Sequence, residues 1–128
     1  MLAGQRRHFP ETGVSGMDLY SYDEGNTTWR WVATTTPTYP LTSEVMVTPD
    51  MLPAASASAT RLYRLHLPTY NSVKDDLYLG LDAGASLVPD NSTLVGFNDN
   101  ESIVWYGSSI LQGGVASRPG AIATHVVS

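Results

Sequence analysis

The chain has 128 residues, enough for one domain, and its apolar and charged fractions are those of a globular protein. Its formal net charge of -5, with one lysine, argues against a nucleic-acid partner, because nucleic acids are bound by clustered lysines and arginines. The absence of cysteine excludes disulfides, cysteine-ligated metals and thiol nucleophiles. We expect no signal peptide and no membrane partner, and nothing in the composition assigns a compartment.

The first predicted elements are short antiparallel strands. Residues 16–22 alternate in side-chain polarity, the cluster at 23–26 is typical of a turn, and residues 28–33 complete a hairpin. A proline-rich break precedes a strand expected at 41–48.

Two more strands are predicted after a loop rich in Pro, Ala and Ser. The first covers residues 61–67, and the second, at 77–82, places three leucines on one face. Short strands separated by proline-rich turns are typical of an antiparallel β-sandwich.

The pattern changes after residue 82. Residues 83–101 have no sustained period and are interpreted as a linker. The continuous apolar run at 102–106 predicts a strand buried on both faces, as in a parallel α/β sheet. Pro119 is expected at the first position of a helix that continues through residues 121–127.

Four short motifs occur in order: GMDLY at 16–20, WRWVAT at 29–34, LPTYNSV at 67–73 and YGSSILQGG at 106–114, the last continued by ASRPG at 116–120. Together they resemble the N-terminal GxDLY domain of some SGNH (GDSL-like) hydrolases, followed by the first block of their catalytic domain.

The resemblance implies a mainly β fold. An antiparallel β-sandwich, jelly-roll-like and incomplete, would lead into the first strand and helix of an α/β/α SGNH domain. The chain then divides into an N-terminally truncated GxDLY-type domain at 1–82, a linker at 83–101 and the start of a hydrolase domain at 102–128. Because the family has strands before the GxDLY motif and catalytic blocks after the first one, we expect this chain to be a fragment.

The same resemblance implies a serine ester hydrolase without cofactor or metal. Its substrate would be an acylated small molecule or a carbohydrate ester. The nucleophile would be Ser109, not Ser108, and the backbone N–H of Ser109 would donate one hydrogen bond to the oxyanion. A serine that follows a buried strand also lies where α/β proteins place their ligands. The alternative is a turn serine without a catalytic role.

A serine hydroxyl is a weak nucleophile that needs a base and a group to orient that base. The family supplies these from a late Asp-x-x-His pair, and this sequence contains no such pair. We therefore expect the isolated chain to be inactive. His125, which follows Ser109 on the next expected helix, is disfavoured as a base, because that position has no catalytic role in the family.

The remaining candidates have ordinary structural interpretations. His8 lies in a terminus that is expected to fray, and His66 alternates with core leucines on its strand. Asp18 is expected to accept hydrogen bonds in a turn. Trp29 and Trp31 share a strand face, and a place in the core is favoured over stacking on sugars. No spacing of His, Asp and Glu resembles a metal site.

Three functions stay open. The first is the N-terminal part of an esterase, as above, and the second is a non-catalytic β-sandwich that binds carbohydrate through its tryptophans. A module that binds a protein partner through the apolar run at 102–106 is the third possibility.

Overall fold

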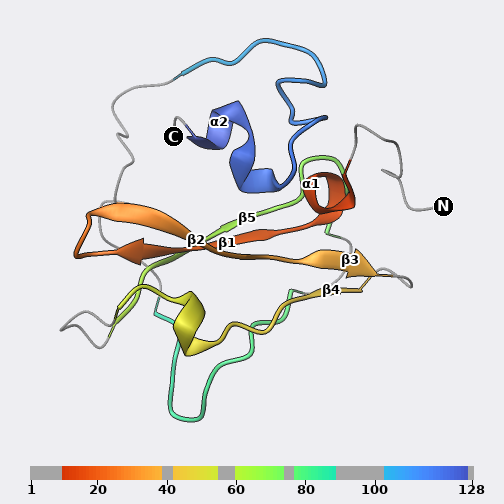
Figure 1. The fold of residues 1–128 in the computed structure, drawn as a ribbon. Coiled ribbons are helices and arrows are strands. Elements are labelled where there is room, and N and C mark those ends of the chain that lie inside the picture. Colours follow the sequence, from red (N-terminus) through yellow and green to blue (C-terminus); the bar gives the residue numbers. More distant parts are fainter. Residues whose placement is uncertain (1–9, 39–41, 55–59, 74–76, 89–102, 127–128) are drawn as a thin grey trace.

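The structure is a computed structural model, and it describes residues 10–38, 42–54, 60–73, 77–88 and 103–126. At its centre lies a three-stranded antiparallel sheet with the strand order β2-β1-β5 (Figure 1). The strands are β1 (Asp18–Asp23), β2 (Thr28–Thr34) and β5 (Tyr63–His66). The central strand β1 thus carries most of the GxDLY motif.

The hairpin predicted from the alternating pattern is confirmed in β1 and β2. Their register pairs Asp23 with Thr28, and a shift between Leu19 and Tyr20 marks an irregularity in the pairing. The carboxylate of Asp23 closes the turn, because it accepts hydrogen bonds from the backbone N–H and the side-chain amide of Asn26 at 3.2 and 2.8 Å.

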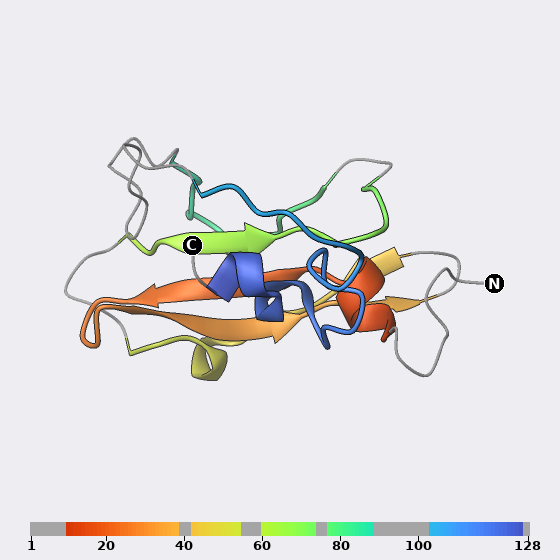
Figure 2. The ribbon, with the colours of Figure 1, turned by 90° about the horizontal axis from the view of Figure 1, so that it is seen from above.

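Other elements cover both faces of the sheet. On one face lies the C-terminal segment (residues 103–126), which contains the 3₁₀ turn η2 (Pro119–Ala121) and the helix α2 (Ala123–Val126). The helix α1 (Glu11–Ser15) lies beside it (Figures 1 and 2). On the other side lie the 3₁₀ turn η1 (Pro49–Met51) and residues 77–88.

A second, two-stranded sheet pairs β3 (Thr36–Thr38) with β4 (Thr42–Glu44). The strand predicted at 41–48 is thus confirmed in its first part, whereas Met46 beyond it is 82% exposed.

The buried apolar side chains of the described residues are few: Val14, Val32, Ala33 and Ile122, besides the prolines Pro37, Pro53 and Pro119. The first four come from α1, β2 and the C-terminal segment. Gly16, the first residue of the GxDLY motif, lets the chain after α1 lie close to the residues that follow β2. A Cβ atom built there would lie 2.7 Å from the carbonyl oxygen of Thr35, so any other residue would push the chain apart.

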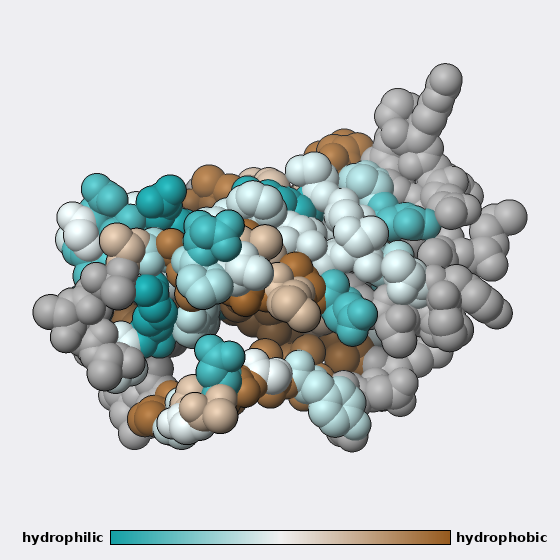
Figure 3. All heavy atoms as spheres, turned by 60° about the horizontal axis from the view of Figure 1, so that its bottom comes forward, coloured by the Kyte–Doolittle hydropathy of each residue, from teal (hydrophilic) through white to brown (hydrophobic). Residues whose placement is uncertain are grey.

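The strand predicted at 77–82 is wrong. Within the described residues this segment forms no strand, and Leu77, Leu79 and Leu81 are 45–57% exposed. Figure 3 brings this side of the molecule forward and shows hydrophobic residues at its surface. The alternating pattern predicted a strand, but a strand also needs a partner whose backbone groups it can bond.

The segment after the predicted linker also differs from the prediction. Residues 103–106, expected in a strand buried on both faces, form no strand, and Tyr106 is fully exposed. Pro119 begins the 3₁₀ turn η2 instead of an α-helix, and the helix predicted at 121–127 is a single turn, α2. A helix of only two turns is not stable by itself, and it forms only where an apolar face packs against the rest of the protein.

The fold class is therefore β-rich with short helices, as predicted. The jelly-roll sandwich and the α/β/α start of a hydrolase domain stay predictions, and most of the predicted linker lies outside the described residues.

Candidate functional site

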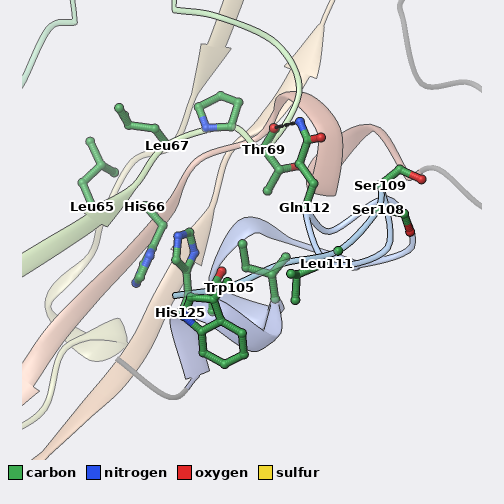
Figure 4. A pocket seen from close by; sticks show the side chains of 14 residues that line it. Leu65, His66, Leu67, Thr69, Trp105, Ser108, Ser109, Leu111, Gln112 and His125 are labelled. Atoms are coloured by element: carbon green, nitrogen blue, oxygen red, sulfur yellow. Dashed lines mark hydrogen bonds between the residues drawn. The ribbon is translucent and has the colours of Figure 1, made fainter. Parts of the chain in front are cut away.

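An open groove of about 840 Å³ lies between β5 and the C-terminal segment. One wall is β5 with the turn that follows it, and the other consists of residues 105–112 and α2. The residues that line it are Leu65, His66, Leu67, Pro68, Thr69, Trp105, Gly107, Ser108, Ser109, Leu111, Gln112, Ile122, Thr124 and His125 (Figure 4). The groove thus contains Ser109 and is also lined by residues of the turn at 67–73.

The loop that carries Ser109 is held through its backbone. The carbonyl oxygen of Ser109 accepts hydrogen bonds from the N–H of Gly114 at 2.8 Å and from the hydroxyl of Tyr70 at 2.6 Å. The side-chain amide of Gln112 donates to the carbonyl of Thr69 at 3.0 Å. Two residues of the turn after β5 therefore fix the serine loop, and the Ser109 side chain stays exposed.

Two histidines lie at the other end of the groove. The ring centroids of His66 and His125 are 4.3 Å apart, and His66 also contacts the ring of Tyr20 edge-on at 5.2 Å. Burial and the neighbouring His125 and Arg64 lower the pKa of His66 to about 4, against a weaker opposing effect of Asp18. His66 is thus neutral at physiological pH.

The structure does not bring the serine and the histidines into a catalytic arrangement. Figure 4 shows the Ser108 and Ser109 side chains at the far end of the groove, directed away from His66 and His125. Nδ1 of His125 lies 2.9 Å from the carbonyl oxygen of Pro119, in its own segment. Within the described residues, both hydrogen bonds of Ser109 run to its carbonyl, so its hydroxyl has no base beside it.

Asp18 is more deeply placed than a turn acceptor would be. Its side chain is fully buried. It accepts hydrogen bonds from Arg118 and from the backbone N–H of Gly120, both at 2.8 Å, and from the hydroxyl of Thr34. Asp18 is thus an acceptor as predicted, but it lies in the strand β1 and not in a turn. Its main partners are about a hundred residues away, however, and no local sequence signal could have identified Arg118.

The two tryptophans of β2 are not part of the core, so the interpretation favoured from the sequence is wrong. Trp31 is 51% exposed, with the guanidinium of Arg118 5.4 Å from its ring centroid. Trp29 is half-buried and contacts the ring of Tyr22 edge-on, with the guanidinium of Arg64 4.4 Å from its centroid. The C-terminal segment covers only part of this sheet face, which is why both indoles reach solvent.

Other kinds of site are not indicated. No group of three or more His, Cys, Asp or Glu side chains in the described residues is placed to hold a metal ion. None of the helices described is long and apolar enough to cross a membrane. His8 lies outside the described residues.

Comparison with protein families identifies the N-terminal part. The family model described as GxDLY, the N-terminus of SGNH-hydrolase-type esterases, matches residues 3–87, more than half of the chain. The chain therefore belongs to the GxDLY family, which confirms the resemblance inferred from its motifs. No match was found among curated proteins or among solved structures. Ser109 lies outside the matched range.

Proposed function

We propose that the chain is the N-terminal portion of an SGNH-type serine esterase and that Ser109 is the nucleophile. One observation carries the proposal: residues of the matched GxDLY domain form one wall of the groove in which Ser109 lies. The substrate would be an acylated small molecule or a carbohydrate ester, bound with its carbonyl carbon at the Ser109 hydroxyl. The backbone N–H of Ser109 would donate to the oxyanion.

The isolated chain would be inactive under this proposal. The Ser109 hydroxyl must lose its proton as it attacks, and the described residues place no base within hydrogen-bond reach. The base and the further oxyanion donors would come from residues that this sequence does not provide. The two histidines of the groove would instead help to shape it.

The first test is p-nitrophenyl acetate hydrolysis by the 128-residue chain, by Ser109→Ala and by Ser108→Ala. We expect all three at the rate of the buffer control, because an unactivated serine hydroxyl attacks an ester slowly. Turnover by the parent chain that is lost in Ser109→Ala alone would show that the chain is already a complete esterase.

The second test asks whether Ser109 is the nucleophile. The protein used for this test carries an Asp-x-x-His block after Ser128. It is treated with a fluorophosphonate, which labels activated serines, and mass spectrometry locates the labelled residue. We expect label on Ser109, with loss of label and activity in Ser109→Ala and retention of both in Ser108→Ala. Activity that survives Ser109→Ala would refute the assignment.

Carbohydrate binding is the second candidate function, favoured by the exposed indole of Trp31. A sugar ring would stack on the part of that indole that Arg118 leaves open. Tryptophan fluorescence titrated with acetylated oligosaccharides should then shift in the parent chain and in Trp29→Phe, but not in Trp31→Phe. A parent spectrum that no sugar changes would leave this function unsupported.

A further inference from the structure

We propose that Asp18, the aspartate of the GxDLY motif, is a positioning residue that docks the segment after the Ser109 loop onto the sheet. It acts through the Arg118 side chain and the Gly120 backbone. That this loop is the nucleophile loop rests on the proposed function, whereas the docking contact itself does not.

Asp18 lies on the central strand under the C-terminal segment. Its carboxylate has no exposed surface, and Oδ2 accepts from both Nη1 of Arg118 and the N–H of Gly120. Oδ1 accepts from the hydroxyl of Thr34 on the neighbouring strand. One buried carboxylate therefore binds the sheet with one oxygen and the C-terminal segment with the other.

Arg118 is held on the sheet by more than its charge. Its guanidinium lies 5.6 Å from the ring centroid of Tyr20 and 5.4 Å from that of Trp31, and it donates to the Tyr20 hydroxyl. Partial burial lowers the pKa of Arg118, but the hydrogen bonds with Tyr20 and Asp18 outweigh this and leave its pKa above the usual value. The arginine thus stays charged at physiological pH.

The backbone of the segment fits the GxDLY residues closely. A Cβ atom at Gly120 would lie 2.6 Å from the Tyr20 hydroxyl and 2.8 Å from Oδ2 of Asp18, so only glycine allows this approach. Nearby, the hydroxyl of Thr12 on α1 donates to the carbonyl of Ser117 at 2.6 Å. The segment therefore meets a surface formed for it by α1 and β1.

This docking point and the turn after β5 hold the Ser109 loop from two sides. Tyr70 binds the carbonyl of Ser109 itself, while Asp18 fixes the chain at Arg118 and Gly120, on the C-terminal side of the loop. Loss of either anchor would let the loop move relative to the β5 wall of the groove. The GxDLY aspartate would thus connect the N-terminal domain to the nucleophile without touching substrate.

A purely structural role for Asp18 predicts a different result from a positioning role. If the ion pair only stabilises the whole fold, its loss exposes every amide alike, through global unfolding. If it docks the segment, its loss exposes the C-terminal amides first, because they open without the sheet. Hydrogen exchange at single residues separates the two.

The experiment measures amide exchange by NMR in the 128-residue chain without substrate. The reporters are the Gly120 amide, bonded to Asp18, and the Gly114 amide, bonded to Ser109; the reference is the Tyr22 amide, bonded to Leu62. In Asp18→Asn and in Arg118→Gln we expect both reporters to exchange on the order of tenfold faster relative to Tyr22. The double variant should match the larger single effect, since each change breaks the same pair.

Two further variants control the result. Asp23→Asn removes the other aspartate–arginine pair of β1, in which the Arg30 side chain is 59% exposed, and should change the reporters by less than about twofold. Arg118→Lys keeps the charge, and the exchange rates of its two reporter amides should lie closer to those of the parent than the rates in Arg118→Gln.

The proposal is overturned if the reporters keep their protection in both variants. It is equally overturned if Tyr22 loses protection to the same extent, which includes complete unfolding of both variants. Because the readout needs no hydrolysis, the two proposals can fail separately. If the reporters behave as expected but the protein with the supplied Asp-x-x-His block keeps its activity in Ser109→Ala, the proposed function alone is refuted. Retained protection of both reporters in Asp18→Asn and Arg118→Gln, together with the predicted labelling of Ser109, would refute this inference alone.

Discussion

Ser21 and Thr35 are both buried hydroxyl residues, but they differ in what their oxygens contact. The Thr35 hydroxyl accepts a hydrogen bond from the backbone N–H of Met17 at 2.9 Å. The Ser21 side chain, which has no exposed surface, finds no hydrogen-bond partner in the part of the chain that the structure describes. A buried polar group without a partner costs free energy, because it has given up its bonds to water.

We therefore predict opposite effects of removing the two hydroxyls. Ser21→Ala should raise the free energy of unfolding by about 1 kcal/mol, whereas Thr35→Val should lower it by about 1–2 kcal/mol and leave the Met17 amide unbonded. Urea denaturation of the two variants and the parent measures both. A destabilised Ser21→Ala variant would show that this hydroxyl does have a partner.

At the scale of the elements, the β1–β2 hairpin and residues 77–82 show why similar sequence patterns have different outcomes. Both alternate, but the hairpin carries its own partner strand across a short turn. The second segment would need a partner from elsewhere in the chain. Its leucines are exposed as a result, while Val32 on β2 is buried at 5% exposure.

Truncations of these side chains should therefore differ in cost. We expect Val32→Ala to lower the free energy of unfolding by about 2 kcal/mol through lost burial and a cavity. Leu79→Ala, at a side chain that is 57% exposed, should cost less than about 0.5 kcal/mol, although it removes more atoms. Thermal or urea unfolding measures the pair; a larger loss for Leu79→Ala would mean that residues 77–82 are packed as the sequence predicted.

At the scale of the whole molecule, His66 lies where the sheet and the C-terminal segment meet. It is on β5, opposite Asp18, and faces His125 of α2, with Arg64 and Arg118 also near. Its pKa of about 4 lies below the usual 6.5, so the unfolded chain binds a proton more readily than the folded one. The stability that His66 contributes is complete above its usual pKa and is lost as the pH falls from there to about 4.

We predict a loss of stability in that window. Because His66 is partly exposed, solvent screening reduces the effect to about 1 kcal/mol between pH ~7.5 and ~4.5. The His66→Gln variant should lose less than half as much stability over the same interval. Urea denaturation of both proteins at the two pH values measures the difference. Asp23 does not interfere, because the hydrogen bond from Asn26 lowers its pKa and its contribution is lost only at more acidic pH. Equal losses in both proteins would contradict the assignment.

The sequence by itself determined the local features. The hairpin and the proline-bounded strand β5 follow from alternation and turn residues, which neighbouring residues decide. The four motifs in order were sufficient to predict the family, and they marked Ser109 as the serine to test.

Only the tertiary structure decided which distant residues meet. It paired Asp18 with Arg118, placed Tyr70 on the carbonyl of Ser109, and left Trp31 exposed. It also separated His125 from the serine hydroxyl, although the two are close in sequence. The physical reason is that burial, ion pairing and strand pairing depend on what the rest of the chain places opposite a residue, and no local pattern contains that information.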